Sequence, residues 1–195
     1  MRVHPQVPNA ITIARILCAP VFLWMLLADG GAGGGLRWAA AVVFIVAIAT
    51  DGIDGYIARR YEIVSDLGKL LDPIADKALT GVAFVGLSIL GELDWWVTIL
   101  VLVREIGITI YRFLVVSDHV LAAAWMGKLK TVAQAVALSI ALLPLASLSE
   151  AAVWQSTVWW AGVVTMTIAV VLTIASGIDY VISEVRGARA KRSAR

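Results

Sequence analysis

The sequence is poor in cysteine, histidine and charge. Cys18 is its single cysteine, so the chain can form neither an internal disulfide nor a site built from several thiolates. Only two histidines occur in 195 residues, which leaves little basis for a zinc site. Charged residues make up 15% of the chain and hydrophobic residues 61%. A soluble domain of this length cannot bury so much apolar surface, so we predict an integral membrane protein.

Most of the chain consists of apolar segments near the length of about 20 residues that a membrane-spanning helix needs. We expect spans at about residues 10–28, 37–58, 70–91, 95–116, 131–148 and 157–182. No internal repeat and no long linker divides them, so residues 1–195 are predicted to form one all-α domain, a six-transmembrane-helix bundle. In the lead VPNAITIARI, Thr12 and Arg15 are three residues apart and share a helix face, which predicts a short N-terminal juxtamembrane amphipathic segment.

Cations gather at one set of predicted helix ends. The opposite connections hold Arg37 alone among cations, together with the acids Asp29, Glu92, Asp94 and Glu150. By the positive-inside rule, both termini and the link between the second and third spans face the cytoplasm. The last ten residues, 186–195, carry five cations and are predicted to be a basic cytoplasmic tail. Most of the eight tryptophans lie near predicted helix ends, as interfacial anchors do.

Four aspartates, Asp51, Asp54, Asp72 and Asp76, interrupt the adjoining ends of the second and third spans. An aspartate at the centre of a spanning helix costs about 2.5 to 3.5 kcal/mol on insertion scales, so such acids indicate function. Helical geometry places each pair on one side of its helix. Because the connection is short, the two helices are predicted to be antiparallel neighbours, and the four carboxylates can converge at the cytoplasmic mouth.

An all-carboxylate site favours Mg²⁺ or Mn²⁺ over zinc. Four acids can hold two such ions, which would clamp a diphosphate. Gly52, Gly55, Ala58 and Gly68 lie among the acids. Small residues in membrane helices more often serve helix packing, but here they would also let a nucleotide approach the backbone closely. Pro73 is expected either to open the third helix or to kink it.

The spacing D-x2-D-G-x2-A-R-x8-G-x3-D-x3-D resembles the signature of the CDP-alcohol phosphotransferases. Its fixed positions are Asp51, Asp54, Gly55, Ala58, Arg59, Gly68, Asp72 and Asp76. The resemblance implies a six-helix membrane enzyme, usually a homodimer, in which an alcohol hydroxyl displaces CMP from a CDP-linked lipid. No nucleic acid is expected as a partner.

The resemblance also implies a role for each position. Asp51, Asp54 and Asp72 would ligate two metal ions, and Asp76 would contact the second ion and act as the general base. Gly55, Arg59 and Ser65 would contact the CDP group, although Ser65 could equally cap the next helix. Further expected contacts of CDP-diacylglycerol are Ala58, Gly68, Asn9 and Thr12.

The wider chain, over residues 7–140, resembles the bacterial phosphatidylglycerophosphate synthases of this family in GKLLDPIADK, VREIGITIYRF and WMGKLKTVAQAVAL. This implies transfer of the phosphatidyl group to sn-glycerol 3-phosphate at the cytoplasmic face of a bacterial plasma membrane. The phosphate dianion of that acceptor needs cations, and the candidates are Arg112, Arg104, Lys128, Lys77 and Lys130. Arg104 could instead pair with Glu105, and the positive-inside rule accounts equally well for Lys128 and Lys130.

The aspartate-containing segments are also compatible with two other functions. A cardiolipin synthase of the same family would use phosphatidylglycerol as the acceptor and shares the segment around Asp72 and Asp76. A cation transporter would use the acids as an ion path, but transporter acids usually lie near the bilayer midplane on broken helices. The aspartates here lie at one face, which disfavours transport.

Overall fold

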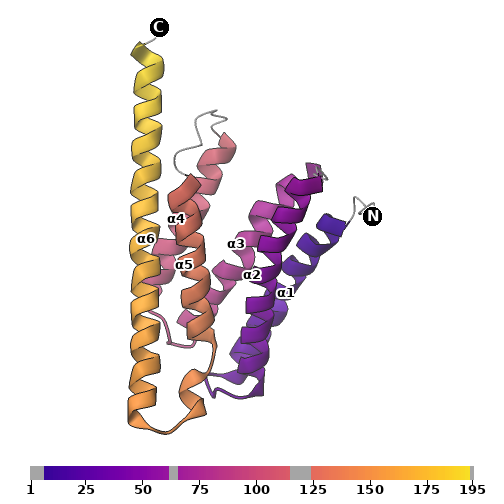
Figure 1. Ribbon diagram of the computed structural model, residues 1–195, viewed down its shortest axis with the longest axis vertical. Coiled ribbons are helices and arrows are strands. Elements are labelled where there is room, and N and C mark those ends of the chain that lie inside the picture. The colour runs from indigo at the N-terminus through magenta and orange to yellow at the C-terminus, as the bar shows by residue number, and fades with distance from the viewer. Residues whose placement is uncertain (1–6, 62–65, 115–123, 194–195) are drawn as a thin grey trace.

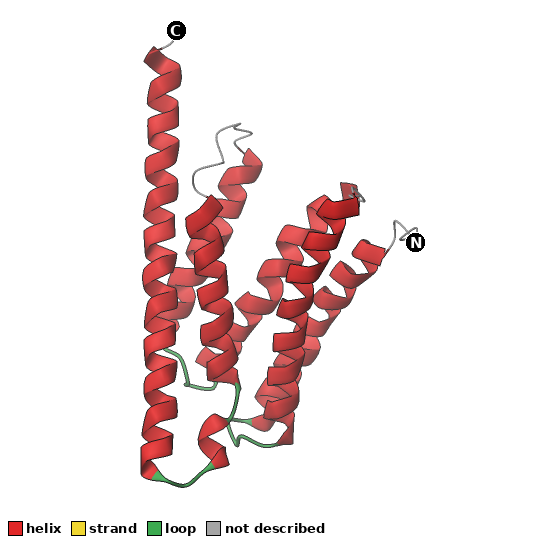
Figure 2. Ribbon diagram, viewed as in Figure 1, coloured by secondary structure: helices red, strands yellow, loops and turns green. Residues whose placement is uncertain are grey.

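The computed structural model describes the backbone of residues 7–61, 66–114 and 124–193, and the side chains of residues 13–50, 77–111 and 125–186. The described residues form helices and no strand, so the predicted all-α class is confirmed (Figure 2). The elements are α1 Val7–Asp29, α2 Gly35–Tyr61, α3 Asp66–Ile89, α4 Trp95–Leu114, α5 Ala124–Leu142, the 3₁₀ helix η1 Leu145–Leu148, and α6 Ala152–Ser193.

The α-helices run up and down along one common direction (Figure 1). The start of α1, the end of α2, the start of α3 and the end of α6 all lie at one end of the bundle. We call this the aspartate end, because it includes the helix segments that carry Asp51, Asp54, Asp72 and Asp76. The links from α1 to α2, from α3 to α4 and from α5 to α6 lie at the opposite end.

The hydrophobic core draws residues from all six α-helices, and α1 packs closely against both α2 and α3. Phe22 of α1 and Phe44 of α2 are fully buried, with their ring centroids 5.7 Å apart. Gly86 of α3 faces Leu26 of α1 so closely that a Cβ atom at position 86 would lie 2.7 Å from Leu26 Cδ2. The glycine therefore permits a close contact between α1 and α3.

A buried arginine joins three parts of the chain at the opposite end. Arg37 of α2 is 4% exposed, and its guanidinium donates to both carboxylate oxygens of Glu92, at 2.9 and 2.5 Å. Its Nε and Nη2 atoms donate to the carbonyls of Leu142 and Ala141 at the end of α5. We call this set of contacts the Arg37 tie. Because every guanidinium nitrogen has a partner, the buried charge is compensated.

Some element boundaries differ from the prediction. The fifth helix ends at Leu142 instead of continuing to 148, because Pro144 has no N–H to donate and disfavours helical geometry in the preceding residue. The predicted N-terminal lead is not a separate element, since residues 7–16 form the first turns of α1. Pro73 does not open α3, which begins at Asp66. The backbone of the predicted basic tail continues α6 as far as Ser193.

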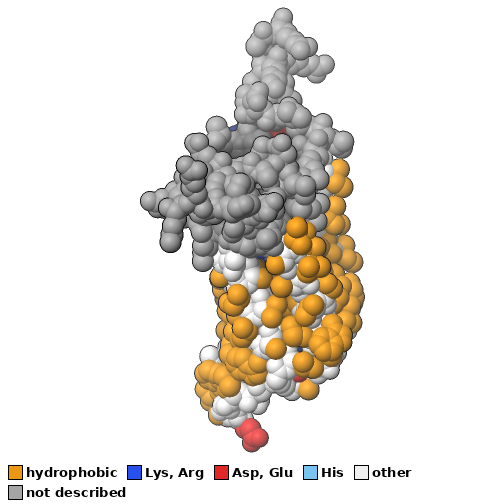
Figure 3. Space-filling model, turned by 90° about the vertical axis from the view of Figure 1, so that its right-hand side faces the viewer, with side chains coloured by type: hydrophobic (Ala, Val, Ile, Leu, Met, Phe, Trp, Pro, Cys, Tyr) orange, Lys and Arg blue, Asp and Glu red, His pale blue; other side chains and the backbone are white. Residues whose placement is uncertain are grey.

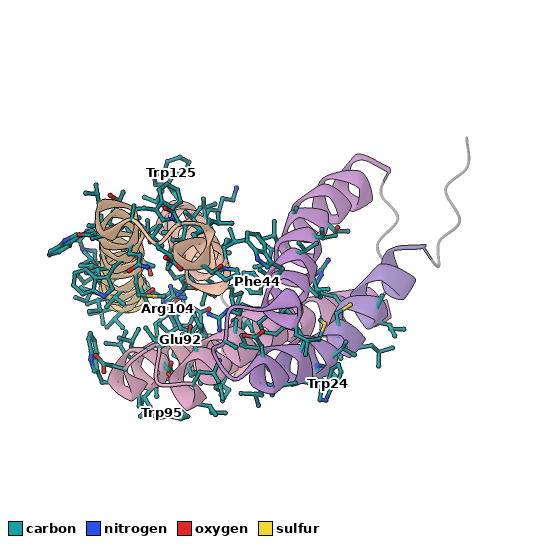
Figure 4. All side chains as sticks on the ribbon, turned by 90° about the horizontal axis from the view of Figure 1, so that it is seen from below. Trp24, Phe44, Glu92, Trp95, Arg104 and Trp125 are labelled. Atoms are coloured by element: carbon teal, nitrogen blue, oxygen red, sulfur yellow. The ribbon has the colours of Figure 1, made fainter. Side chains whose placement is uncertain are left out.

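The outer surface of the bundle is apolar. Figure 3 shows hydrophobic side chains spread over the described part of one face, and large apolar residues such as Val21, Ile99 and Val171 are exposed. Trp24, Trp95 and Trp125 point away from the bundle (Figure 4). Within the part of the chain with described side chains, one helical stretch, Ala152–Arg186, is long and apolar enough to cross a membrane, and Gly35–Thr50 and Lys77–Ile89 form shorter apolar helices. The six-span topology stays a prediction.

Candidate active site

The fold brings the two predicted aspartate pairs to the same end of the bundle. Asp51 and Asp54 lie in the last turns of α2, and Asp72 and Asp76 lie in the first turns of α3. The two helices run in opposite directions and contact each other, as the short connection predicted (Figure 1). The side chains of the aspartates lie outside the described residues, so convergence of the four carboxylates stays a prediction.

The other predicted donor-site residues within the described helices also lie at the aspartate end. Gly55, Ala58 and Arg59 belong to the C-terminal part of α2, and Gly68 belongs to the first turn of α3. Asn9 and Thr12 lie at the start of α1, which reaches the same end (Figure 1). Ser65 lies outside the described residues. Where side chains are described, no group of three or more His, Cys, Asp or Glu residues is placed to hold a metal ion.

Three of the predicted acceptor cations surround one carboxylate. Arg104 Nη1 donates to Glu105 Oε1 at 3.0 Å, Lys130 Nζ donates to the same oxygen, and Lys77 Nζ lies 3.9 Å from Glu105 Oε2. We call these four side chains the Glu105 cluster. The sequence anticipated the pair of Arg104 with Glu105 as an alternative to phosphate binding, and that pair is confirmed.

The Glu105 cluster continues into a polar seam between α4, α5 and α6. Arg104 Nη2 donates to Ser176 Oγ at 3.0 Å, and Gln134 Nε2 donates to Thr173 Oγ1 at 2.8 Å. Figure 4 shows that Arg104 points into the bundle. The Nε atom of Arg104 is buried and has no hydrogen-bond partner among the described residues.

Sequence reasoning did not single out Gln134, Thr173 or Ser176. The available signal was the placement of polar residues at helical spacing in apolar segments. Lys130 and Gln134 are four residues apart on α5, and Thr173 and Ser176 are three apart on α6, so each pair shares a helix face. Polar side chains that share a face of an apolar helix indicate a polar contact with a neighbouring helix.

Lys77 differs from the other two cations in how it is held. Its Nζ atom donates to the carbonyl oxygen of Glu105 at 3.2 Å and to the hydroxyl of Thr109. The side chain of Lys77 is 30% exposed, against 17% for Arg104 and 5% for Lys130. Lys128, two residues before Lys130, is exposed. Arg112 lies near the end of α4, and its side chain lies outside the described residues.

An apolar groove of about 340 Å³ lies between α1 and α2. Its lining includes Ala14, Cys18, Val46 and Thr50, together with the buried Arg15. Thr50 directly precedes Asp51 in the chain, so the lining of the groove reaches the residue before the first of the aspartates.

Comparison with known proteins identifies the family. A sequence profile of the CDP-alcohol phosphatidyltransferase family matches residues 5–175. The chain is 43% identical over 178 residues to the probable phosphatidylglycerophosphate synthase of Mycobacterium tuberculosis strain H37Rv, covering 91% of this chain and 81% of the relative. It is 37% identical over 148 residues to the CDP-diacylglycerol–glycerol-3-phosphate 3-phosphatidyltransferase of Bacillus subtilis, covering 71% of this chain and 77% of the relative. Identity to the Escherichia coli protein of the same name is 33% over 186 residues, covering 90% and 92%. The chain therefore belongs to the CDP-alcohol phosphatidyltransferase family, as its aspartate motif predicted.

Proposed function

We propose that this protein transfers the phosphatidyl group of CDP-diacylglycerol to sn-glycerol 3-phosphate, giving phosphatidylglycerophosphate and CMP in phospholipid synthesis. The observation that carries the proposal is the similarity to relatives named for this reaction. The similarity to the M. tuberculosis and E. coli proteins covers about nine-tenths of this chain. All eight fixed positions of the family motif are present on the two helix segments at the aspartate end.

Asp51, Asp54 and Asp72 would bind two divalent metal ions, Mg²⁺ or Mn²⁺. The donor set fits hard cations because it consists of carboxylate oxygens on two neighbouring helices. When bound, the ions supply positive charge to the diphosphate and lower the pKa of the acceptor hydroxyl. Asp76 would take the proton of that hydroxyl as it attacks the phosphorus atom joined to the lipid, and CMP would leave.

The donor lipid would bind along α2. Room for the CDP group would come from the small residues Gly55, Ala58 and Gly68. Polar contacts would come from Arg59, Ser65, Asn9 and Thr12. The groove between α1 and α2 would take part of an acyl chain, since it is apolar and its lining reaches Thr50, the residue before Asp51. A membrane-embedded site is consistent with this arrangement, because the acyl chains can stay in the bilayer while the CDP group faces the aspartates.

The acceptor phosphate would be met by cations from α3, α4 and α5, namely Lys77, Arg104, Arg112, Lys128 and Lys130. The exposures of Lys77 and Lys128 support a direct contact with a solute. Arg104 and Lys130 are turned toward Glu105, so they would act at longer range through their charge.

We further propose a multi-pass protein of the bacterial plasma membrane, with six spans, both termini and the aspartate end in the cytoplasm, that works as a homodimer. The apolar surface with outward-pointing tryptophans supports a membrane location. The charge distribution supports the proposed orientation. Arg37 is the single cation near the connections opposite the aspartates, and its charge is paired with Glu92.

The test is release of CMP from CDP-diacylglycerol by purified protein in detergent or vesicles. Parallel reactions would contain glycerol 3-phosphate, phosphatidylglycerol, inositol phosphate or serine. We expect release only with glycerol 3-phosphate, abolished by a chelator and restored by Mg²⁺ or Mn²⁺. Release only with phosphatidylglycerol would instead establish a cardiolipin synthase. A cation transporter would give ion flux in vesicles without any CDP-linked lipid.

A further inference from the structure

Lys77 directly follows Asp76 in α3, but its ammonium group is fixed to α4. It donates to the carbonyl oxygen of Glu105 and to the hydroxyl of Thr109. Thr109 Oγ1 in turn donates to the same carbonyl oxygen at 2.7 Å. The threonine hydroxyl therefore accepts from the lysine and donates to the backbone, so its lone pair is oriented toward the ammonium.

Lys77 is also the most exposed cation of the Glu105 cluster. Lys130 and Arg104 both donate to Glu105 Oε1, and their side chains are 5% and 17% exposed. Lys77 lies farther from the carboxylate, at 3.9 Å, and its side chain is 30% exposed. The contacts from α4 thus hold the ammonium group of the most exposed cation of the cluster.

We infer that Thr109 is a positioning residue of the acceptor site, which holds the Lys77 ammonium between α3 and α4 where it meets the phosphate of glycerol 3-phosphate. The inference rests on the proposed function and adds how the cation is placed. Glycerol 3-phosphate carries its phosphate and its attacking hydroxyl at opposite ends of a three-carbon chain. The cation that receives the phosphate must therefore stand at a fixed place relative to Asp76, which takes the hydroxyl proton.

A lysine needs such a support because its side chain has four rotatable methylene groups and a single point of charge. Being next to Asp76 in sequence places only the Cα atom of Lys77. The hydroxyl of Thr109 and the carbonyl of Glu105 supply the fixed point for the Nζ atom. Loss of the hydroxyl should therefore weaken acceptor binding without changing the metal ligands or the donor site.

The test compares two threonines that each join α3 to α4. Thr109→Val keeps the side-chain shape and removes the hydroxyl, and we expect the KM for glycerol 3-phosphate to rise about tenfold with kcat and the KM for CDP-diacylglycerol nearly unchanged. Thr109→Ser keeps the hydroxyl and should retain the wild-type KM. The matched control is Thr98→Val, because Thr98 bonds to Ser88 at 2.7 Å at the opposite end of the same helix pair. It should leave both KM values unchanged.

A double mutant shows whether Thr109 acts through Lys77. Lys77→Met should raise the KM for glycerol 3-phosphate, and adding Thr109→Val should cause no further rise, because the partner of the hydroxyl is already gone. Additive effects, an unchanged KM in Thr109→Val, or an equal rise in Thr98→Val would each overturn the inference. Thr109→Ala provides the same comparison where valine prevents folding. Wild-type protein that releases no CMP with glycerol 3-phosphate would overturn the proposed function itself, before any variant is measured.

Discussion

Single carboxylates carry the chemistry proposed for this protein, and the two on α3 have different roles. Asp72 is proposed to ligate metal, whereas Asp76 is proposed to contact the second ion and to remove the proton from the acceptor. Both are isosteric with asparagine, which cannot carry the negative charge. Replacement therefore separates the charge from the space that the side chain fills.

We expect Asp72→Asn and Asp76→Asn each to lower the rate of CMP release by about 100-fold or more, since a lost general base alone costs that much. The measurement is CMP released from CDP-diacylglycerol with saturating glycerol 3-phosphate and Mg²⁺. Asp94→Asn is the control, because Asp94 lies in the link between α3 and α4 at the opposite end, and it should keep wild-type turnover. Full turnover in either α3 variant would refute the roles assigned to these aspartates.

At the residue level, the sequence predicted positions in the motif but few of the contacts around it. The motif residues were found because all of them lie within one short stretch of the chain, residues 51–76, at fixed spacing. The Glu105 cluster joins residues that are far apart in sequence, since Lys130 is 25 positions from Glu105 and Ser176 is 72 positions from Arg104. Contacts of this kind depend on how the helices pack, which hydropathy does not specify.

At the level of elements, each end of the bundle is held by a charged side chain with several partners. The Arg37 tie joins α2, the link after α3 and the end of α5. The Glu105 cluster joins α3, α4 and α5 nearer the aspartate end. The two sets have similar chemistry, but only the second contains residues proposed to bind substrate. Disrupting each should therefore have different consequences.

Arg37→Met removes the charge and all of the hydrogen bonds of the Arg37 tie. We expect a loss of about 2 kcal/mol in stability, below the range of about 3 to 5 kcal/mol for fully buried pairs because Glu92 is a third exposed. Thermal unfolding in detergent measures the loss as a lower Tm, while kcat below the transition stays at the wild-type value. Arg37→Lys keeps the charge but lacks the planar guanidinium group, so its Tm should lie between those of the wild type and Arg37→Met. A normal Tm with lost activity would contradict this role.

The helices were predicted well where apolar length decides the outcome and less well at their ends. Five of the predicted segments, 10–28, 37–58, 70–91, 95–116 and 157–182, lie within or close to α1, α2, α3, α4 and α6. The remaining predicted segment, 131–148, was placed too late in the chain. Hydrophobic residues continue past Pro144, but α5 ends at Leu142 because of the proline. The last helix was taken as too short because its final residues are polar. Alanine, arginine and lysine nevertheless favour helix, so a loss of hydropathy does not mark a helix end.

At the scale of the whole molecule, α6 is longer than a membrane is thick. Its 42 residues extend about 63 Å at 1.5 Å per residue, about twice the hydrocarbon thickness of about 30 Å. Figure 1 shows its C-terminal end projecting beyond the other helices at the aspartate end. If the bundle spans the membrane as proposed, the basic final turns must stand in the cytoplasm, where they are favoured by the positive-inside rule.

The single cysteine makes this orientation testable. Cys18→Ala removes every thiol from the chain, so a new cysteine becomes the sole target of a membrane-impermeant maleimide. We expect Glu150→Cys, in the link between η1 and α6, to be labelled in spheroplasts, where the inner membrane is sealed and the outer face accessible. Ser193→Cys, at the last residue of α6, should be labelled only after the membrane is broken. The unsubstituted Cys18→Ala protein serves as the blank, and CMP release by each variant verifies that it is folded. Labelling of position 193 in sealed spheroplasts would place the aspartate end outside the cell, away from any cytoplasmic supply of CDP-diacylglycerol, and would refute the proposed orientation.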